Sequence, residues 1–222
     1  MGPLATVRLM ERIVTMTEAH SDQEHVEVIA FNCGTIPDRT AYILDPGKPS
    51  PLPKLKSYAK QLEELGASCI GIPCITAHYF YQEIQNHVSI PVINMLEESV
   101  RTLQEMKVTK VGIMATSGTL QTKILQDTLA RFDVAYDTPD SSTEEIIMSL
   151  IYDDVKAGRR ASTSKMDAVS DFYHSKGCDC IILGCTELSI VKDELGLSDG
   201  YLDVLDVLAR LAIVKCNKRL KQ

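Results

Sequence analysis

Two cysteines, Cys74 and Cys185, occupy matching places in a sequence that repeats itself. The stretch GASCIGIPC at residues 66–74 can be laid over GCDCIILGC at residues 177–185, and four residues then coincide at a constant offset of 111 residues (185 − 74). Self-similarity at half the chain length indicates duplication of one structural unit. In each copy an apolar strand is predicted to follow a glycine that ends a helix, and the cysteine stands where that strand ends. The two thiols are therefore expected at equivalent positions in two halves.

A pair of thiols on opposite walls of a cleft suits inversion at a carbon atom. If the two halves face one another, the thiolate of one cysteine removes a proton from one face of the carbon while the thiol of the other delivers a proton to the opposite face. Two groups are needed because a single base tends to return the proton to the face it came from. Each thiol must titrate near neutrality, which a cysteine at a helix start or close to cations can do.

Most of the other cysteines need no function. The chain has seven cysteines, an odd number without an export signal, which indicates free thiols and not a disulfide framework. Cys69 and Cys180 lie within apolar strands and are expected to pack as small hydrophobic residues. A metal site at Cys178, Cys180 and Cys185 is disfavoured because a paired C-x-x-C partner is lacking, and no metal is predicted.

Charge and composition restrict the partners. The chain has 222 residues, enough for one large domain or two small ones, and its formal charge of −7 argues against nucleic acid and anionic membrane surfaces. No apolar run approaches the length needed to span a bilayer, and the amino terminus lacks the features of a signal peptide. A cytoplasmic location is expected.

The elements that must position the thiols follow an α/β pattern. Helices are expected at residues 4–19, 54–65, from 76, 96–106, 118–130, 143–156, 163–176 and 204–218, and strands at 26–32, 67–73, 90–94, 110–114, 132–136 and 179–183. The proline-rich segment 33–53 is expected to be an irregular loop of the kind that lines sites. Alternating strands and helices predict parallel sheets with sites at the carboxyl ends of the strands.

Helix starts with hydroxyl side chains provide a second, weaker echo between the halves. The stretches GPLAT at residues 2–6 and TSGT at residues 116–119 both open helices with a threonine and lie a similar distance upstream of their cysteines. Helix amino termini bind carboxylates through free N–H groups and the helix dipole. The predicted cleft therefore combines two thiols with anion-binding groups.

Several motifs in order resemble the aspartate racemase branch of the aspartate/glutamate racemase family. They are MGPLAT (1–6), IPDRT (36–40), PCITAHYF (73–80), NMLEE (94–98), ATSGT (115–119) and GCTEL (184–188), and together they span the chain almost end to end. The resemblance implies two similar doubly wound α/β domains with pseudo-twofold symmetry and the active site between them. It also implies catalysis without pyridoxal phosphate or any other cofactor, an acidic amino acid as the small-molecule substrate, and a homodimer. The expected boundaries are residues 1–94 plus 204–222 for the first domain and 95–203 for the second.

The resemblance also assigns roles residue by residue. Cys74 and Cys185 become the two acid/base groups, Arg39 matches the family's clamp for the side-chain carboxylate, and Lys156 matches a second cation. A guanidinium suits a carboxylate because it grips it through two parallel hydrogen bonds. Hydroxyl and backbone donors to the α-carboxylate are expected from Thr76, Thr119 and Thr186. The remaining substrate-binding residues in this assignment are Thr6, Asn32, Thr116 and Glu187.

Two side chains near the cysteines have a structural alternative. His78 could tune Cys74, but an isolated histidine near a helix start is more often a structural hydrogen-bonding residue. Glu187 either orients the second site or simply sits at a helix start, where an acidic residue is favourable.

The chain departs from the family pattern at two places. Ile75 stands where the family usually has Asn, which removes one polar donor, and in the repeat it aligns with Thr186, so a less symmetric site is expected. Relatives place an apolar strand and a pair of glycines ahead of the Met-Gly-Pro motif, which is residues 1–3 here. The first strand of the first domain is therefore expected to be missing, with a start codon assigned too late as the explanation.

The predicted activity is cofactor-independent racemisation of aspartate, with glutamate as a further substrate. A related lyase, decarboxylase or isomerase on the same fold is the alternative among enzymes, and retention of both cysteines favours the racemase. A protein that binds an acidic amino acid with little or no turnover is the alternative outside enzymes.

Overall fold

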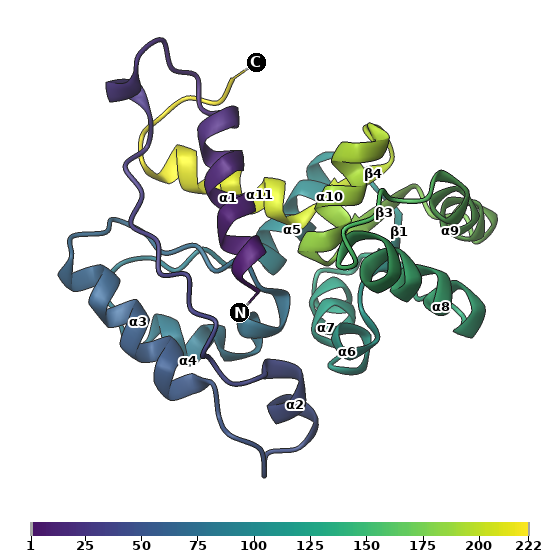
Figure 1. Ribbon diagram of the computed structural model, residues 1–222, viewed down its shortest axis with the longest axis horizontal. Helices are drawn as coiled ribbons and strands as arrows, with labels where there is room; N and C mark the ends of the chain where they lie inside the picture. The colour runs from purple at the N-terminus through teal and green to yellow at the C-terminus, as the bar shows by residue number, and fades with distance from the viewer. Residues whose placement is uncertain (1, 222) are drawn as a thin grey trace. The chain divides into compact units, whose positions relative to one another are not determined.

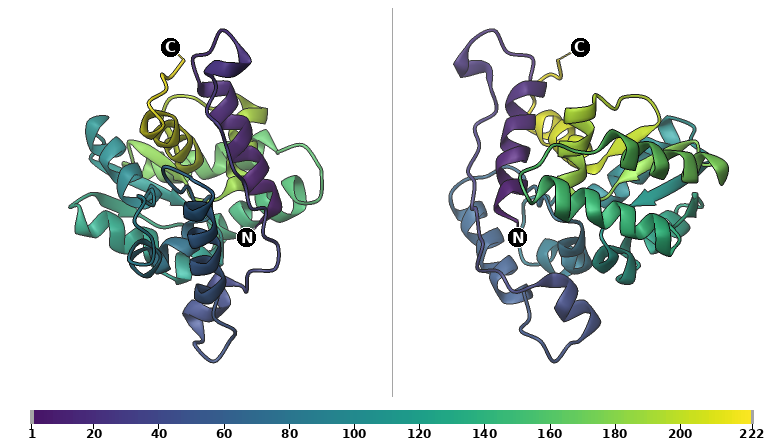
Figure 2. Two further views of the ribbon diagram at one scale, coloured as in Figure 1. Left: turned by 90° about the vertical axis from the view of Figure 1, so that its left-hand side faces the viewer. Right: turned by 45° about the vertical axis from the view of Figure 1, so that its right-hand side comes forward.

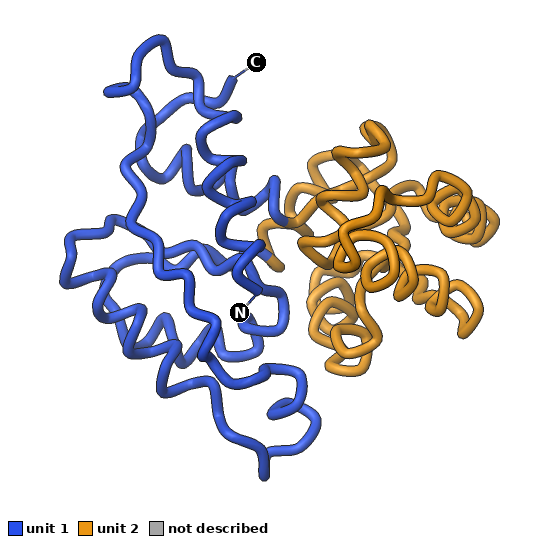
Figure 3. The backbone as a smooth tube through the Cα atoms, viewed as in Figure 1, with its two compact units in different colours: residues 1–95, 205–222 blue, residues 96–204 orange. Residues whose placement is uncertain are grey.

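The computed structural model describes residues 2–221 and divides the chain into two compact units (Figure 3). Unit 1 comprises residues 1–95 and 205–222, and unit 2 comprises residues 96–204. Two helices, α5 (Met95–Glu105) and α11 (Val204–Lys215), begin at the two places where the chain passes from one unit to the other.

Unit 2 is built around a parallel four-stranded sheet. Its strands are β1 (Lys110–Met114), β2 (Ala135–Asp137), β3 (Cys180–Leu183) and β4 (Tyr201–Asp203), in the order β2-β1-β3-β4. The central strands are in register from Val111 opposite Cys180 to Met114 opposite Leu183. Residues of both faces of β1, such as Ile113 and Met114, are fully buried. The sheet is therefore covered on both sides, as expected for parallel strands joined by helical crossovers.

The helices of unit 2 alternate with these strands along the chain (Figure 1). They are α6 (Ser117–Gln121), α7 (Ile124–Arg131), α8 (Ser141–Ser149), a π-helix η3 (Leu150–Val155), α9 (Thr163–Ser175) and α10 (Thr186–Leu195). Helix α9 packs closely on β1 because Gly112 has no side chain. A Cβ built on Gly112 would lie 2.4 Å from the ring of Tyr173, whose hydroxyl donates a hydrogen bond to the carbonyl of Ile113.

Unit 1 contains helices and extended segments. Its helices are α1 (Pro3–Met16), α2 (Arg39–Leu44), α3 (Leu52–Glu64) and α4 (Tyr81–Gln85), with short 3₁₀ helices η1 (Asp22–Glu24) and η2 (Ile75–Phe80). The views of Figure 2 show α1 beside α11, where Arg12 Nε lies 2.8 Å from Asp206 Oδ1. A backbone bridge between Thr17 and Leu220 joins the ends of the same two segments.

The core of unit 1 lies between its helices and two extended segments. It includes Ile36, Leu55, Ile72, Phe80 and Ile84, all of which are buried. The extended segments meet at one parallel bridge between Ile70 and Val92, where the N–H of Ile70 donates to the carbonyl of Pro91 and the N–H of Ile93 donates to that of Ile70.

The α/β class with a parallel sheet is confirmed, but the strands expected in unit 1 are largely wrong. Residues 26–32 are extended without a pairing partner among residues 2–221, and the strands expected at 67–73 and 90–94 are reduced to the single bridge at Ile70. The apolar pattern of residues 26–31 favours a strand, but a strand is assigned only where a neighbour accepts its hydrogen bonds.

Other differences arise from local backbone chemistry. The helix expected at residues 118–130 is two helices, because Lys123 adopts a left-handed conformation with φ of 55°. The helix expected at 143–156 changes from α to π at Leu150. Within the expected loop 33–53, the Asp38 side chain caps a short helix, α2, by accepting a hydrogen bond from the N–H of Ala41. Strand β4 and helix α10 were not expected as separate elements.

No helix in the described part of the chain is long and apolar enough to cross a membrane.

Candidate active site

Cys74 lies at the end of the extended segment of unit 1, immediately before η2. It has extended backbone angles, and its half-buried thiol sits 3.5 Å from the hydroxyl of Thr76. Thr76 is buried in the first turn of η2. Ile75, the next residue after Cys74 along the chain, is buried with 6% of its surface exposed.

His78 holds the backbone of Cys74 in place from inside unit 1. Its Nδ1 lies 2.9 Å from the carbonyl oxygen of Cys74, and the N–H of Met95 donates to its Nε2 over 3.3 Å. Because a carbonyl can only accept, Nδ1 carries the proton and Nε2 is the acceptor. Burial lowers the pKa of His78, which favours this neutral tautomer. One ring therefore links the Cys74 turn to Met95. The Nε2 atom also lies 3.3 Å from the carbonyl oxygen of Ile93, but in this tautomer the two acceptors form no hydrogen bond.

Arg39 begins helix α2, which packs on η2 through a contact between the rings of Tyr42 and Phe80. Its Nη1 donates to the carbonyl of Pro37 over 3.2 Å. Its Nε is buried and has no hydrogen-bond partner among the residues described. A buried guanidinium donor without a partner is costly, and an anionic ligand would satisfy it.

For the two other candidates in unit 1, no contact with Cys74 is found within residues 2–221. Thr6 is half-buried on α1 and lines a cavity of unit 1, and Asn32 is exposed in the extended segment that precedes α2.

Cys185 lies directly before α10 in unit 2, at the carboxyl end of β3. The N–H of Gly184 donates to the carbonyl of Met114 over 2.8 Å, which ties the Cys185 turn to the end of β1. The thiol of Cys185 donates to Oε2 of Glu187 over 2.8 Å, and the hydroxyl of Thr186 donates to the same oxygen over 3.2 Å. Burial raises the pKa of the Cys185 thiol far above its ordinary value, and the negative charge of Glu187 adds to this. Without substrate, Cys185 is therefore a thiol.

Lys156 brings a positive charge to this group. Its Nζ lies 3.7 Å from Oε1 of Glu187 and 4.1 Å from the centre of the Tyr152 ring. Lys156 is still 42% exposed in its side chain, so the cation can reach a ligand as well as Glu187. The four residues Lys156, Cys185, Thr186 and Glu187 thus form one cluster of contacts.

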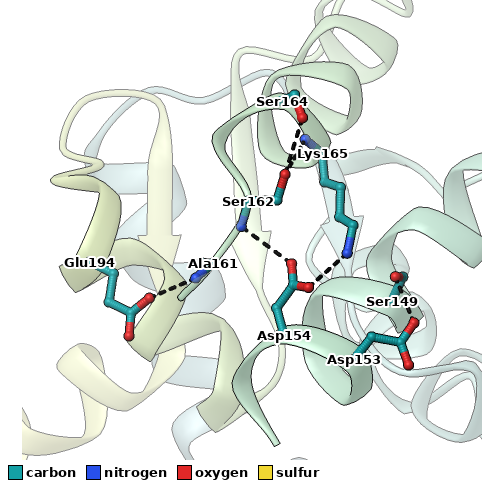
Figure 4. Close-up of polar contacts among 8 residues, drawn as sticks. All are labelled: Ser149, Asp153, Asp154, Ala161, Ser162, Ser164, Lys165 and Glu194. Atoms are coloured by element: carbon teal, nitrogen blue, oxygen red, sulfur yellow. Dashed lines mark hydrogen bonds and ion pairs between the residues drawn. The ribbon is translucent and has the colours of Figure 1, made fainter. Parts of the chain in front are cut away.

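Buried contacts of Asp154 hold the segment that follows Lys156 (Figure 4). Its carboxylate accepts from Lys165 Nζ over 2.8 Å and from the N–H of Ser162 over 3.2 Å. The N–H of Ala161 donates to Glu194 of α10 over 2.8 Å, so the same segment is attached to the helix that begins after Cys185. Sequence reasoning missed Asp154, although an acidic residue within an apolar helical stretch must find partners when it is buried.

Thr116 and Thr119 form the other polar group of unit 2. Thr116 caps α6, because its hydroxyl accepts from the N–H of Thr119 over 3.2 Å, and the two hydroxyls lie 3.0 Å apart. This group follows β1 and the Cys185 group follows β3. Neighbouring parallel strands end at the same edge of a sheet, so both groups lie where ligands bind in α/β folds.

Each unit therefore places one cysteine at the end of an apolar segment and before a helix, with a threonine hydroxyl nearby. Within residues 2–221 no group of three or more His, Cys, Asp or Glu side chains is arranged to hold a metal ion. The chemistry available at both places is that of a thiol with neighbouring hydroxyl, carboxylate and ammonium groups.

Comparisons with known proteins agree with these features. The chain is 24% identical over 221 residues to the broad specificity amino-acid racemase RacX of Bacillus subtilis, covering 96% of this chain and 93% of that protein. Among solved structures, it resembles Picrophilus torridus aspartate racemase with a TM-score of 0.82 and 27% identity, over 99% of this chain and 92% of that one. An aspartate racemase homologue from Pyrococcus horikoshii has the same fold, with a TM-score of 0.82 and 19% identity over 97% and 95% of the chains.

The family model for Asp/Glu/Hydantoin racemases matches residues 1–212. The chain therefore belongs to the Asp/Glu/Hydantoin racemase family and is an isomerase of the amino-acid racemase class.

Proposed function

We propose that this protein racemises aspartate, and glutamate as a further substrate, by a two-base mechanism in which Cys74 and Cys185 act on opposite faces of the α-carbon. The observation that carries the proposal is the matched placement of the two cysteines, each at the end of an apolar segment and before a helix, in a chain of this family. No cofactor is required, because the thiols supply both the base and the acid.

The protonation state of Cys185 suggests how turnover begins. Burial and the negative charge of Glu187 keep Cys185 as a thiol, so we assign Cys185 as the proton donor and Cys74, acting as a thiolate, as the base for one enantiomer. The Cys74 thiolate takes the α-proton, the electron pair of the C–H bond passes to the α-carbon and its carboxylate, and the Cys185 thiol gives its proton to the other face. The product then has the opposite configuration, Cys74 is a thiol and Cys185 is a thiolate. The reverse reaction starts from that state.

The polar side chains divide the work of holding the substrate. Arg39 takes the side-chain carboxylate, for which its unpartnered buried Nε is suited, and Lys156 supplies a second cation. Thr76, Thr119 and Thr186 donate to the α-carboxylate and meet the charge that develops there. Thr6, Asn32, Thr116 and Glu187 complete the proposed set. A homodimer in the cytoplasm is the form that we propose for the active protein.

Incubation with L-aspartate in deuterated water tests this function. We expect D-aspartate carrying deuterium at the α-carbon, measured by chiral chromatography with mass spectrometry. The reaction should persist in the presence of hydroxylamine, which would trap an enzyme-bound pyridoxal aldehyde. Cys216→Ser is a matched control, because Cys216 is another half-buried thiol of unit 1 and should leave the rate unchanged. Binding of aspartate without exchange would indicate a binding protein, and release of carbon dioxide would indicate a decarboxylase.

A further inference from the structure

The chain leaves the α-helical conformation shortly before Lys156. Helix α8 continues into the π-helix η3, and the N–H of Lys156 donates over 3.0 Å to the carbonyl of Ile151, five residues back. Gly158 then adopts a left-handed conformation with φ of 70°, and helix α9 follows. Because π-turns are rare and occur often at functional sites, this backbone indicates a constraint on where Lys156 points.

Asp154 is the buried acidic residue of this turn. Its side chain is 8% exposed, whereas the neighbouring Asp153 is exposed. The Oδ1 atom of Asp154 accepts from Nζ of Lys165 over 2.8 Å, and Oδ2 accepts from the N–H of Ser162 over 3.2 Å (Figure 4). Both partners belong to the start of α9, so the carboxylate joins the end of η3 to the next helix.

The ion pair of Asp154 and Lys165 is not needed to seal the core. Apolar residues of similar volume often replace a buried ion pair without loss of stability, whereas a carboxylate with fixed donors restrains the backbone that carries it. Lys165 also lies in the first turn of α9, where a cation is unfavourable to the helix dipole unless an anion lies beside it. Geometry therefore explains the pair better than stability does.

A second contact attaches the segment after Lys156 to α10. The N–H of Ala161 donates to Oε2 of Glu194 over 2.8 Å, and α10 also packs on η3. Between these two attachments the chain carries Lys156, whose Nζ lies 3.7 Å from Oε1 of Glu187 in the first turn of α10. The four-carbon side chain of a lysine is flexible, so its ammonium group keeps such a position better when the backbone is fixed.

We propose that Asp154 is a positioning residue for Lys156. Its ion pair with Lys165 fixes the turn that directs the ammonium group of Lys156 toward Glu187 and the Cys185 thiol. The part of Lys156 in holding substrate rests on the proposed function, but its effect on Cys185 does not. Burial raises the pKa of the Cys185 thiol and the positive charge of Lys156 lowers it, so displacement of the ammonium group makes the thiol harder to ionise.

Alkylation of Cys185 by iodoacetamide at pH 8, with Cys74 as the internal control, measures this positioning. Asp154→Asn should slow the reaction about threefold, and so should Lys165→Met, whereas Lys165→Arg keeps the ion pair and should retain the wild-type rate. Loss of the Asp154 charge would by itself favour the thiolate, and a loosened fold would expose the thiol. Both effects speed the reaction, so slower alkylation in Asp154→Asn is the result expected of a displaced Lys156.

Two further variants separate this role from a structural one. Asp153→Asn is the matched control, because Asp153 lies on the same turn, is exposed and accepts a hydrogen bond from the hydroxyl of Ser149 over 2.8 Å. It should not slow the reaction. Lys156→Met should slow the reaction as Asp154→Asn does. The double variant should be no slower than Lys156→Met alone, because a residue that acts through another has no effect once that other residue is removed.

Unchanged or faster alkylation of Cys185 in Asp154→Asn would overturn the proposal, and so would a double variant slower than Lys156→Met. If Asp154→Asn does not fold, the same comparison is made with Lys165→Met, and additive slowing would again overturn it. In racemisation, KM for aspartate should rise at least about threefold in Asp154→Asn with a smaller change in kcat. A wild-type chain without racemase activity would refute the proposed function but leave the alkylation result standing.

Discussion

Cys185 and Glu187 form a thiol–carboxylate hydrogen bond of 2.8 Å at the start of α10. The bond lies next to the carboxyl end of β3, and ligands of α/β folds bind at the carboxyl ends of the strands. A carboxylate beside a thiol opposes loss of the thiol proton, because the thiolate would face a second negative charge. The pair therefore keeps Cys185 protonated unless a further charge lowers its pKa. Lys156, whose Nζ lies 3.7 Å from the same carboxylate, is the nearest cation in this cluster.

Glu187→Gln should lower the pKa of Cys185 while leaving it above the ordinary cysteine value, because burial remains the larger cause of the shift. The rate of alkylation by iodoacetamide at pH 8 should rise at Cys185, about tenfold for each unit by which the pKa falls. Mass spectrometry of the alkylated peptides resolves Cys185 from Cys74, which serves as the internal control in the same sample. An unchanged or slower reaction at Cys185 would show that Glu187 does not govern its protonation.

His78→Gln should make stability less dependent on acid. Because burial lowers the pKa of His78 in the folded chain, the unfolded chain binds more protons below the ordinary value of 6.5. The contribution of the neutral ring is therefore present above pH 6.5 and is lost as the pH falls toward the folded pKa. Urea denaturation at pH 7.5 and pH 5.5 should show a smaller loss of stability for the variant than for the wild type. A larger loss in the variant would refute this role.

How far the sequence predicts the molecule depends on whether a feature is local. The repeat predicts that Cys74 and Cys185 stand at the ends of apolar segments, and the structure has both there, because an apolar run is defined by nearby residues. The strand expected at residues 26–32 depends on a partner elsewhere in the chain, and no sequence window contains that information. The same holds for the hydrogen bond from the N–H of Met95 to His78, which requires the fold to bring two distant segments together.

Side-chain contacts explain why some site residues were predicted and others were missed. Glu187 and Lys156 were named through the family resemblance, but their contact spans 31 residues of sequence and only the structure supplies it. Asp154 was missed because an acidic residue in a helical pattern is usually solvated, whereas here Lys165 and the N–H of Ser162 hold it inside.

Gly112→Ala should destabilise the chain by about 1–3 kcal/mol, the usual cost of overpacking a core. The added Cβ would lie 2.4 Å from the Tyr173 ring, which cannot withdraw without losing its hydrogen bond to Ile113. Urea denaturation measures the change. Gly71→Ala is the matched control, because its Cβ would meet Leu208 and Leu9 at ordinary distances of 3.5 and 3.8 Å, and it should change stability by less than about 0.5 kcal/mol. Equal effects of the two substitutions would contradict the close approach at Gly112.

Arg39→Lys should raise KM for aspartate about tenfold with a smaller change in kcat. Lysine keeps the charge but lacks the planar pair of donors that grips a carboxylate, and such a pair is worth about one to two kcal/mol more than a single contact. Steady-state racemisation of aspartate and of alanine separates the effects, because alanine has no side-chain carboxylate. A proportional rise in KM for both amino acids would place Arg39 outside the side-chain pocket.

Replacing either cysteine by serine should abolish racemisation but leave exchange of the α-hydrogen with solvent for one of the two enantiomers. A serine hydroxyl is too weak an acid or base to replace the thiol, so inversion should fall by at least about a thousandfold in Cys74→Ser and in Cys185→Ser. The cysteine that remains still faces one side of the α-carbon. In deuterated water it should exchange the α-hydrogen of one enantiomer only, without inverting it, and the favoured enantiomer should differ between the two variants. Proton NMR of separate L- and D-aspartate samples follows this exchange, with Cys216→Ser as the control. Exchange of the same enantiomer in both variants would place the two thiols on one face of the substrate, and racemisation that survives in both would exclude them as the acid and base.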